Sequence, residues 1–172
     1  MNELSACVLC EHRCGVDRTR RAAGLCLAPA RPRVFAELLE YGEEDGLVPA
    51  WAISLSGCNF ACPFCITGEQ SQDATAGLAT DPESLAGRAR EAVDRGARAI
   101  VVLGGEPTIF LPFLEELTTR LRGCGVPLAL KTNLWCTEAA LARALEAFDV
   151  IVADFKFGND TCARRLGAFP GY

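Results

Sequence analysis

The chain has 172 residues, half of them apolar, so it is long enough to bury one core beside a small appendage. Its 17 basic and 22 acidic residues give a formal charge of −5, which offers no electrostatic argument for nucleic-acid binding. No apolar run is long enough to cross a bilayer, and Met1–Ser5 lacks the basic start and apolar stretch of a secretory signal. We therefore expect a cytoplasmic protein without a membrane or nucleic-acid partner.

The first part of the chain, residues 1–48, is rich in cysteine and shows little periodicity. We expect it to be a small cysteine-rich, metal-binding appendage with a short strand at 34–39. The basic run Arg18–Arg21 is expected to be a solvated loop, and a phosphate or partner contact is the alternative.

From residue 49 onward, strand and helix patterns alternate. Short apolar runs predict buried strands at 51–56, 99–103, 126–130 and 149–154. Apolar residues at helical spacing predict helices between these strands, at 82–95, 110–122 and 137–147. Asp81 and Pro82 supply the N-cap and opening proline of the first helix, and Thr137 opens the last.

This alternation predicts an α/β fold with parallel strands and right-handed crossovers. A complete eight-stranded barrel needs about 200 residues or more. We therefore expect residues 49–172 to form a partial (β/α) barrel with about four βα units. The chain would then be a fragment, a truncated gene product or an unusually minimal form of such a protein. The unusual motifs all fall just after strands, where parallel α/β folds place their active sites.

Ten cysteines in a chain expected to be cytoplasmic indicate metal or redox chemistry, because reducing compartments disfavour disulfides. Cys58, Cys62 and Cys65 follow the first predicted strand at spacings that can wrap one face of a metal cluster. Iron–sulfur clusters are normally held by four thiolates, so three thiolates leave one iron open to a small molecule. The alternatives are a zinc site completed by a distant cysteine and chance clustering.

The pattern Cys58-x-x-x-Cys62-x-Phe64-Cys65 resembles the motif of the radical S-adenosylmethionine (SAM) superfamily. The resemblance implies that the three catalytic cysteines hold a 4Fe-4S cluster whose open iron is chelated by SAM. It also implies that one electron from an outside flavodoxin-like or ferredoxin-like reductant splits SAM into methionine and a 5′-deoxyadenosyl radical. Phe64 would then pack near the adenine.

Gly104, Gly105 and Glu106 follow the second predicted strand and match the superfamily's motif for the amino group of SAM. Glycines let backbone carbonyls approach a ligand closely, and an ammonium group in a site stripped of water needs such acceptors. The alternative is an ordinary turn between a strand and a helix.

Two further elements resemble the pyruvate formate-lyase activating enzymes. Asp154 and Lys156 end the fourth predicted strand and match an element whose lysine contacts the SAM carboxylate, although they could be surface residues at a sheet edge. Asn133 follows the third strand, but Lys131 and Leu134 depart from the acidic residue and the glycine that flank this position in that group. Lys131 could itself place positive charge near the ligand, or simply be a strand-end surface residue.

Cys7, Cys10, Cys14 and Cys26 place four thiols on a segment too poor in apolar residues to fold without a staple. Four thiolates can close either a zinc site or an iron–sulfur site, so a second metal of either kind is expected here. His12 lies inside this run as an alternative ligand, although we expect it to be exposed to solvent.

Over nearly all its length the chain resembles a branch of the radical SAM superfamily related to pyruvate formate-lyase activating enzymes. This resemblance implies an oxidoreductase whose radical abstracts hydrogen from a substrate. In the activase version the substrate is a glycine of a partner protein, and a peptide or small molecule is the alternative. The competing hypotheses are a non-catalytic iron–sulfur or zinc protein, used for electron transfer or as a scaffold, and an inactive truncated remnant.

Overall fold

A computed structural model describes residues 3–42 and 44–167 of the chain. Residues 1–2, 43 and 168–172 lie outside the described part. They include the start of Met1–Ser5, considered above for a secretory signal, and the end of the expected core. Within the described part, none of the helices combines the length and the apolar character that crossing a bilayer requires.

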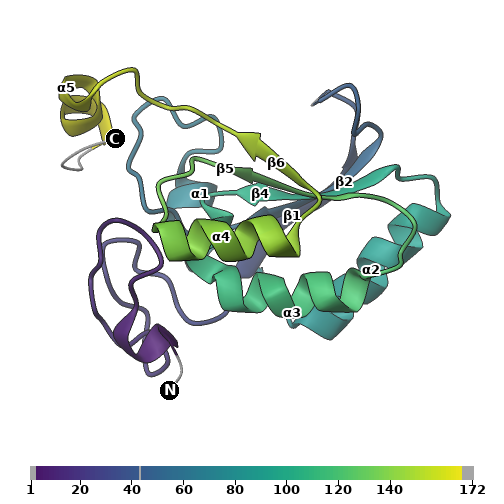
Figure 1. Ribbon diagram of the computed structural model, residues 1–172, viewed down its shortest axis with the longest axis horizontal. Coiled ribbons are helices and arrows are strands. Elements are labelled where there is room, and N and C mark those ends of the chain that lie inside the picture. Colours follow the sequence, from purple (N-terminus) through teal and green to yellow (C-terminus); the bar gives the residue numbers. More distant parts are fainter. Residues whose placement is uncertain (1–2, 43, 168–172) are drawn as a thin grey trace.

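A single sheet forms the centre of the molecule, with its strands in the order β3-β1-β2-β4-β5-β6 (Figure 1). The strands are β1 Arg33–Glu40, β2 Ala50–Leu55, β3 Leu78–Ala79, β4 Ala99–Gly104, β5 Leu128–Thr132 and β6 Val150–Ala153. The pairs β2·β4, β4·β5 and β5·β6 are all parallel. The prediction of a partial parallel α/β barrel with four strand and helix units is therefore confirmed.

Helices connect the parallel strands and lie on one face of the sheet (Figure 1). The longer helices are α2 Pro82–Asp94, α3 Leu111–Leu121 and α4 Glu138–Ala147. The shorter helical segments are η1 Glu3–Ala6, α1 Glu69–Gln72, η2 Pro107–Phe110, α5 Asp160–Cys162 and η3 Ala163–Gly167. Asp81 caps α2 by accepting a hydrogen bond from the Ser84 backbone N–H at 2.9 Å, and Pro82 stands at the first helical position, as predicted.

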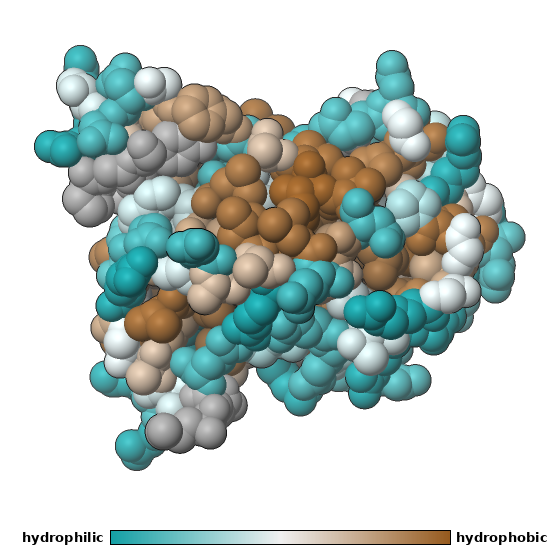
Figure 2. Space-filling view, viewed as in Figure 1, coloured by the Kyte–Doolittle hydropathy of each residue, from teal (hydrophilic) through white to brown (hydrophobic). Residues whose placement is uncertain are grey.

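The two faces of the sheet differ in their covering. Side chains such as Ile53, Ile100 and Leu130 belong to the same buried cluster as Leu85 of α2 and Leu114 of α3. The opposite face carries smaller residues, and part of it is only half-buried. The apolar cluster on this opposite face comprises Leu47, Ala50, Ala99, Val101 and Ala129, with Leu103, Val150 and Val152 packed against it. Figure 2 shows apolar side chains gathered over the middle of the sheet and β6.

Two features of the sheet lie outside the predicted pattern. The third parallel strand begins at Leu128, because the preceding Pro127 has no N–H for a strand ladder. The strand expected at 34–39 exists as β1, but it pairs antiparallel with β2 and is therefore part of the main sheet. The 48/49 boundary consequently falls between two paired strands.

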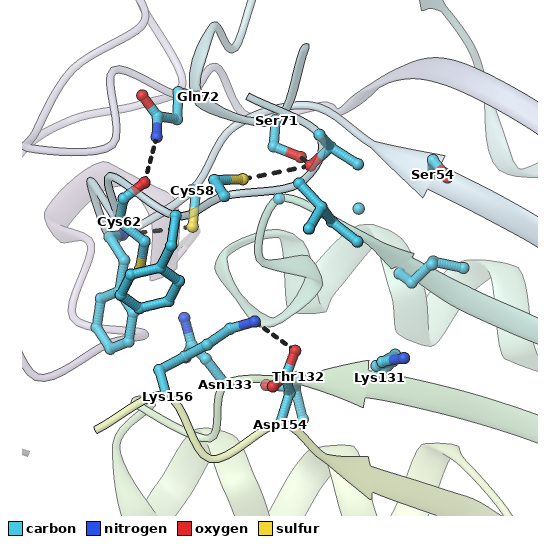
Figure 3. A pocket seen from close by; sticks show the side chains of 18 residues that line it. Ser54, Cys58, Cys62, Ser71, Gln72, Lys131, Thr132, Asn133, Asp154 and Lys156 are labelled. Atoms are coloured by element: carbon cyan, nitrogen blue, oxygen red, sulfur yellow. Dashed lines mark hydrogen bonds and ion pairs between the residues drawn. The ribbon is translucent and has the colours of Figure 1, made fainter. Parts of the chain in front are cut away.

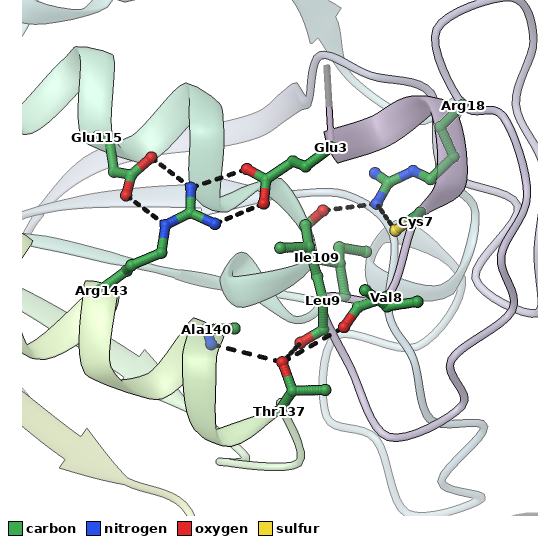
Figure 4. Close-up of polar contacts among 10 residues, drawn as sticks. All are labelled: Glu3, Cys7, Val8, Leu9, Arg18, Ile109, Glu115, Thr137, Ala140 and Arg143. Atoms are coloured by element: carbon green, nitrogen blue, oxygen red, sulfur yellow. Dashed lines mark hydrogen bonds and ion pairs between the residues drawn. The ribbon is translucent and has the colours of Figure 1, made fainter. Parts of the chain in front are cut away.

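The N-terminal segment lies against α3, α4 and η2 (Figures 1 and 4). Arg143 of α4 bridges Glu3 and Glu115, with N–O distances of 2.5 and 2.6 Å. The Thr137 backbone N–H donates to the Leu9 carbonyl at 3.0 Å. The contacts of Glu3 with Arg143 and of Leu9 with Thr137 join residues more than a hundred positions apart, so the cysteine-rich segment is fixed to the core.

The prediction that Arg18–Arg21 is a solvated loop is wrong for Arg18, which is 2% exposed. Its guanidinium donates to the carbonyl oxygens of Ala28, Pro29 and Ile109 at 3.0, 2.7 and 2.7 Å. A buried guanidinium is tolerated only when its donors are satisfied in this way. The charge of the run does not indicate that three backbone carbonyls surround Arg18.

Candidate active site

The carboxyl ends of the parallel strands converge on one cavity of about 290 Å³ (Figure 3). Each strand contributes from the loop that follows it, as parallel α/β folds predict. Nine of the predicted site residues line this cavity: Cys58, Cys62, Phe64, Cys65, Gly104, Gly105, Asn133, Asp154 and Lys156. Four loops, the first beginning after Leu55 and the last after Ala153, thus form one site.

The loop carrying the three cysteines is fixed at its base by backbone contacts. Gly57 has φ +95°, donates its N–H to the Ser71 carbonyl at 2.8 Å, and accepts from the Glu106 N–H at 2.9 Å. A Cβ on Gly105 would lie 2.0 Å from the Gly57 carbonyl oxygen. Both positions therefore require glycine, and the second glycine of the Gly104-Gly105 pair holds the cysteine loop against β4.

The three thiols have different environments. Burial, reinforced by the negative charge of Glu106, raises the pKa of Cys58 to about 12. Burial also raises the pKa of Cys62. Burial acts in the same direction on Cys65, but hydrogen bonds from Thr67 and Gly68 and the charge of Lys156 outweigh it, so the pKa of Cys65 is lowered. Without a metal the loop therefore favours neutral thiols at Cys58 and Cys62, and a metal must displace their protons.

Glu106 lies behind the cavity instead of lining it. Its side chain is fully buried, and its carboxylate accepts from Thr108 N–H, Thr108 Oγ1, Thr132 Oγ1 and Asn133 N–H at 3.0, 2.6, 2.7 and 2.8 Å. Burial raises the pKa of this carboxyl, and the same hydrogen bonds oppose the rise. Of the Gly-Gly-Glu motif, the two glycines face the cavity while the glutamate ties the end of β4 to the end of β5.

Asn59 is a site residue that the sequence did not reveal. Its side-chain oxygen accepts from Asn133 Nδ2 at 2.9 Å, and its own amide donates to the Trp135 carbonyl at 3.2 Å. These bonds tie the cysteine loop to the loop after β5. An asparagine beside a cysteine motif carries no signal for this role until the partner loop is known.

Two lysines place positive charge on one wall of the cavity. Lys156 forms an ion pair with Asp154, two residues earlier in the chain, and Lys131 reaches the same cavity from the end of β5. The remaining polar lining, which includes Ser54, Thr67, Ser71 and Gln72, had no recognisable pattern in the sequence. Three thiols, glycine backbone and cations thus face one hollow.

Comparison with known proteins agrees with this arrangement. The sequence profile of the radical SAM superfamily matches residues 53–171. The chain belongs to the radical SAM superfamily. Members of this superfamily are enzymes that use a 4Fe-4S cluster and SAM.

The relatives of this radical SAM chain differ in what is known of them. The uncharacterized protein MJ0674 of Methanocaldococcus jannaschii is 31% identical over 177 residues, covering 99% of this chain and 51% of that protein. The 7-carboxy-7-deazaguanine synthase of Neisseria meningitidis serogroup B is 34% identical over 112 residues, covering 62% and 48%. The radical SAM chain thus spans about half the length of the curated relatives that it matches.

A solved structure shares the radical SAM fold. SuiB of Streptococcus suis, crystallised with its precursor peptide SuiA, matches with a TM-score of 0.52 and 17% sequence identity. The match covers 66% of this chain and 25% of SuiB. At this identity the likeness concerns the fold alone.

The residues around the cavity fit the cofactors of the superfamily. The donor set is three cysteines on one loop, which leaves a cluster iron open. The Gly104–Gly105 backbone stands at the cavity wall, where a side chain would collide with Leu55 or Gly57. Within the described residues, His, Cys, Asp and Glu side chains form no preassembled three-ligand metal site. The evidence that Cys58, Cys62 and Cys65 act together is therefore that all three line the same cavity.

The four N-terminal cysteines line a second, much smaller cavity of about 20 Å³. His12, which we expected to be exposed to solvent, is instead half-buried. Its Nε2 donates to the Asn59 carbonyl at 2.8 Å, and its ring packs edge-on against Trp135 with centroids 4.3 Å apart. The histidine thus lies between the cysteine-rich segment and the loop that carries Cys58.

Proposed function

We propose that this chain is the cluster-binding and SAM-binding part of a radical SAM enzyme related to the pyruvate formate-lyase activating enzymes. Cys58, Cys62 and Cys65 hold the 4Fe-4S cluster. The observation that carries this assignment is their convergence with Gly104 and Gly105 on one cavity of about 290 Å³. When bound, the cluster supplies the electron that cleaves SAM, and an outside flavodoxin-like or ferredoxin-like protein replaces that electron.

The other residues of the cavity bind and orient SAM in this proposal. The carbonyls of Gly104 and Gly105 accept from its amino group, because an ammonium needs acceptors in a partly dehydrated site. Lys156 lines the same cavity and donates to the SAM carboxylate, because a cation beside a bound carboxylate forms a charge-assisted hydrogen bond. Phe64 packs near the adenine, and Asn133 and Asp154 hold the loops on either side. Glu106 acts as a positioning residue.

The substrate in this proposal is a glycine in a loop of a partner protein, as in the activase branch. Apolar side chains at the mouth of the site support a macromolecular partner. Ile66 and Phe64, both on the cavity, are 102% and 49% exposed, and Phe155 beside it is 76% exposed. Exposed apolar groups around a pocket are typical of interaction surfaces.

The decisive experiment is anaerobic reconstitution with iron and sulfide, followed by dithionite and SAM. We expect the wild-type chain to release 5′-deoxyadenosine and Cys62→Ala to fall to the background measured without protein, because one cluster ligand is lost. Cys124→Ala is the matched control, since this half-buried cysteine lies outside both cysteine-lined cavities. Equal yields from wild type and Cys62→Ala would reject the catalytic assignment and favour an electron carrier or an inactive remnant.

The substrate class requires a separate measurement. A candidate partner deuterated at its glycine Cα should pass deuterium to 5′-deoxyadenosine in the activase version. Deuterium transfer only from a small molecule would reject the protein substrate and leave the SAM chemistry intact.

A further inference from the structure

The segment that carries the N-terminal cysteines is held together by very little regular structure. Within residues 3–32, the regular structure consists of the single turn of η1 and two isolated internal bridges, Cys7 with Val16 and Ala23 with Ala28. Arg13 and Leu27, each next to one of the cysteines, have positive φ values of 45° and 47°. Such conformations in residues with side chains persist only where the surroundings fix them. Leu4, Leu9 and Ala28 anchor this segment in the main core, so a staple would act on the irregular loops between them.

Four cysteines around one small cavity are the candidates for that staple. Cys7, Cys10, Cys14 and Cys26 line one cavity, and each of them is a free cysteine. Gly24 lies so close to this set that a Cβ on it would be 3.4 Å from the Cys14 sulfur. The described side chains form no preassembled group of three or more metal ligands, so these four thiols must close around the ion as it binds. Four thiolates then complete the tetrahedral shell of a closed structural site.

The size of the cavity distinguishes between the two metals that four cysteines can bind. Its volume is about 20 Å³, while a space of about 10–15 Å³ holds one water molecule. A single ion matches this space, whereas a four-iron cluster has eight core atoms to accommodate. The cavity at Cys58, Cys62 and Cys65, at about 290 Å³, is an order of magnitude larger.

Arg18 supplies a positive charge where four thiolates would need one. Its guanidinium Nη1 lies 3.5 Å from the Cys7 sulfur, its other hydrogen bonds go to the backbone carbonyls described above, and its Cζ lies 5.3 Å from the centroid of the Phe110 ring. Within the described residues, no carboxylate forms an ion pair with this buried cation. Four thiolates around a divalent ion carry excess negative charge, so a buried guanidinium in contact with one sulfur lowers the cost of placing them there.

We propose that Cys7, Cys10, Cys14 and Cys26 bind one zinc ion in a closed structural site. Each thiol loses its proton to solvent as the metal binds, and no electron is transferred. The site has a second effect through His12, which lies between two of the ligands in sequence and donates to the Asn59 carbonyl at 2.8 Å. Zinc binding thus steadies the contact between the N-terminal segment and the residue that follows Cys58.

Metal analysis of the full chain tests the site without any assay of SAM cleavage. Elemental analysis should give one zinc per chain in wild type, in addition to iron after reconstitution. In Cys26→Ser we expect zinc to fall by about tenfold or more, because four-thiolate coordination is lost, while the iron bound by the other cavity remains. Cys124→Ser is the matched control and should keep both metals.

X-ray absorption at the zinc edge of the wild-type chain keeps the proposal testable if Cys26→Ser fails to fold. We expect sulfur neighbours alone, at about 2.3 Å. A nitrogen neighbour would replace one cysteine by His12 and overturn the four-thiolate site. Iron that is lost in Cys26→Ser, or wild-type chain without zinc, would overturn the metal's identity. Each of these outcomes leaves the assignment of Cys58, Cys62 and Cys65 untouched, so failure of one site is distinguishable from failure of the other.

Discussion

The two cavities lined by cysteine differ in their number of thiols, their size and their surroundings. The larger cavity has three thiols, bare glycine backbone and two lysines, and exposed apolar side chains stand at its mouth. The smaller cavity has four thiols beside a buried guanidinium and little free space. Three thiol ligands beside a cavity large enough for a small molecule favour a reactive metal centre. Four thiol ligands around a cavity with space for a single ion favour a structural metal site. The comparison shows that cysteine spacing becomes informative when the space around the thiols is known.

Gly105→Ala is expected to have the largest effect on one cavity, the larger one, while leaving the other unchanged. The new Cβ would meet the Gly57 carbonyl oxygen at 2.0 Å and the Ser71 carbonyl oxygen at 2.8 Å, so two backbone segments must move. We expect a loss of about 3 kcal/mol or more in the free energy of unfolding, and loss of SAM binding. Chemical unfolding and equilibrium dialysis with SAM measure these effects.

The matched control for this substitution is Gly87→Ala. Gly87 lies within α2, and a Cβ there meets no atom within 4 Å, so stability should be unchanged or slightly higher. Zinc content is expected to be the same in both variants. Unaltered SAM binding by Gly105→Ala would show that the contact between the two loops does not shape the larger cavity.

A smaller effect is expected from Glu106→Gln. Backbone N–H groups donate to both carboxylate oxygens, Thr108 to one and Asn133 to the other. Whichever way the new amide turns, its NH₂ group faces one of these donors, so a buried hydrogen bond is lost. We expect a destabilisation of about 2 kcal/mol, measured by chemical unfolding. Glu116→Gln on α3 is the control, and equal stability of both variants would contradict the role of Glu106 in joining β4 to β5.

The smallest effect is expected from His12→Ala. This substitution removes the hydrogen bond that joins the N-terminal segment to the loop carrying Cys58, and it leaves all cysteines in place. Loss of the bond to the Asn59 carbonyl should cost about 1 kcal/mol in the free energy of unfolding. Zinc content should be unchanged, while the electron paramagnetic resonance spectrum of the reduced 4Fe-4S cluster should shift. His12→Gln keeps a donor and should restore part of the loss. An identical spectrum in all three proteins would show that the two cavities are independent.

Much of the fold could be predicted because its signals are local. The strand runs, the Asp81 cap and the helical spacing each depend on neighbouring residues, and the predicted elements are present, with β5 starting two residues later than the sequence indicated. The convergence of the three cysteines, the glycine pair and Lys156 also followed, because every motif stood after a parallel strand. That rule converts positions in sequence into positions in space.

The features that the sequence did not reveal all depend on partners distant in the chain. Arg18 was expected in solvent because the run around it is basic, but carbonyls from three separate positions satisfy its guanidinium. His12 and Asn59 meet across 47 positions. Glu106 belongs to a motif that predicts ligand contact, and only the loop after β5 shows that its side chain turns to Thr132 and Asn133.

The antiparallel pairing of β1 with β2 has a consequence for how the site can move. β2 leads directly into the cysteine loop and is hydrogen-bonded on one edge to β1 and on the other to β4. A strand held on both edges is among the last parts of a domain to open by local unfolding. The loop therefore starts from a stiff root, so the point at which the three thiols attach to the sheet stays still when a ligand binds.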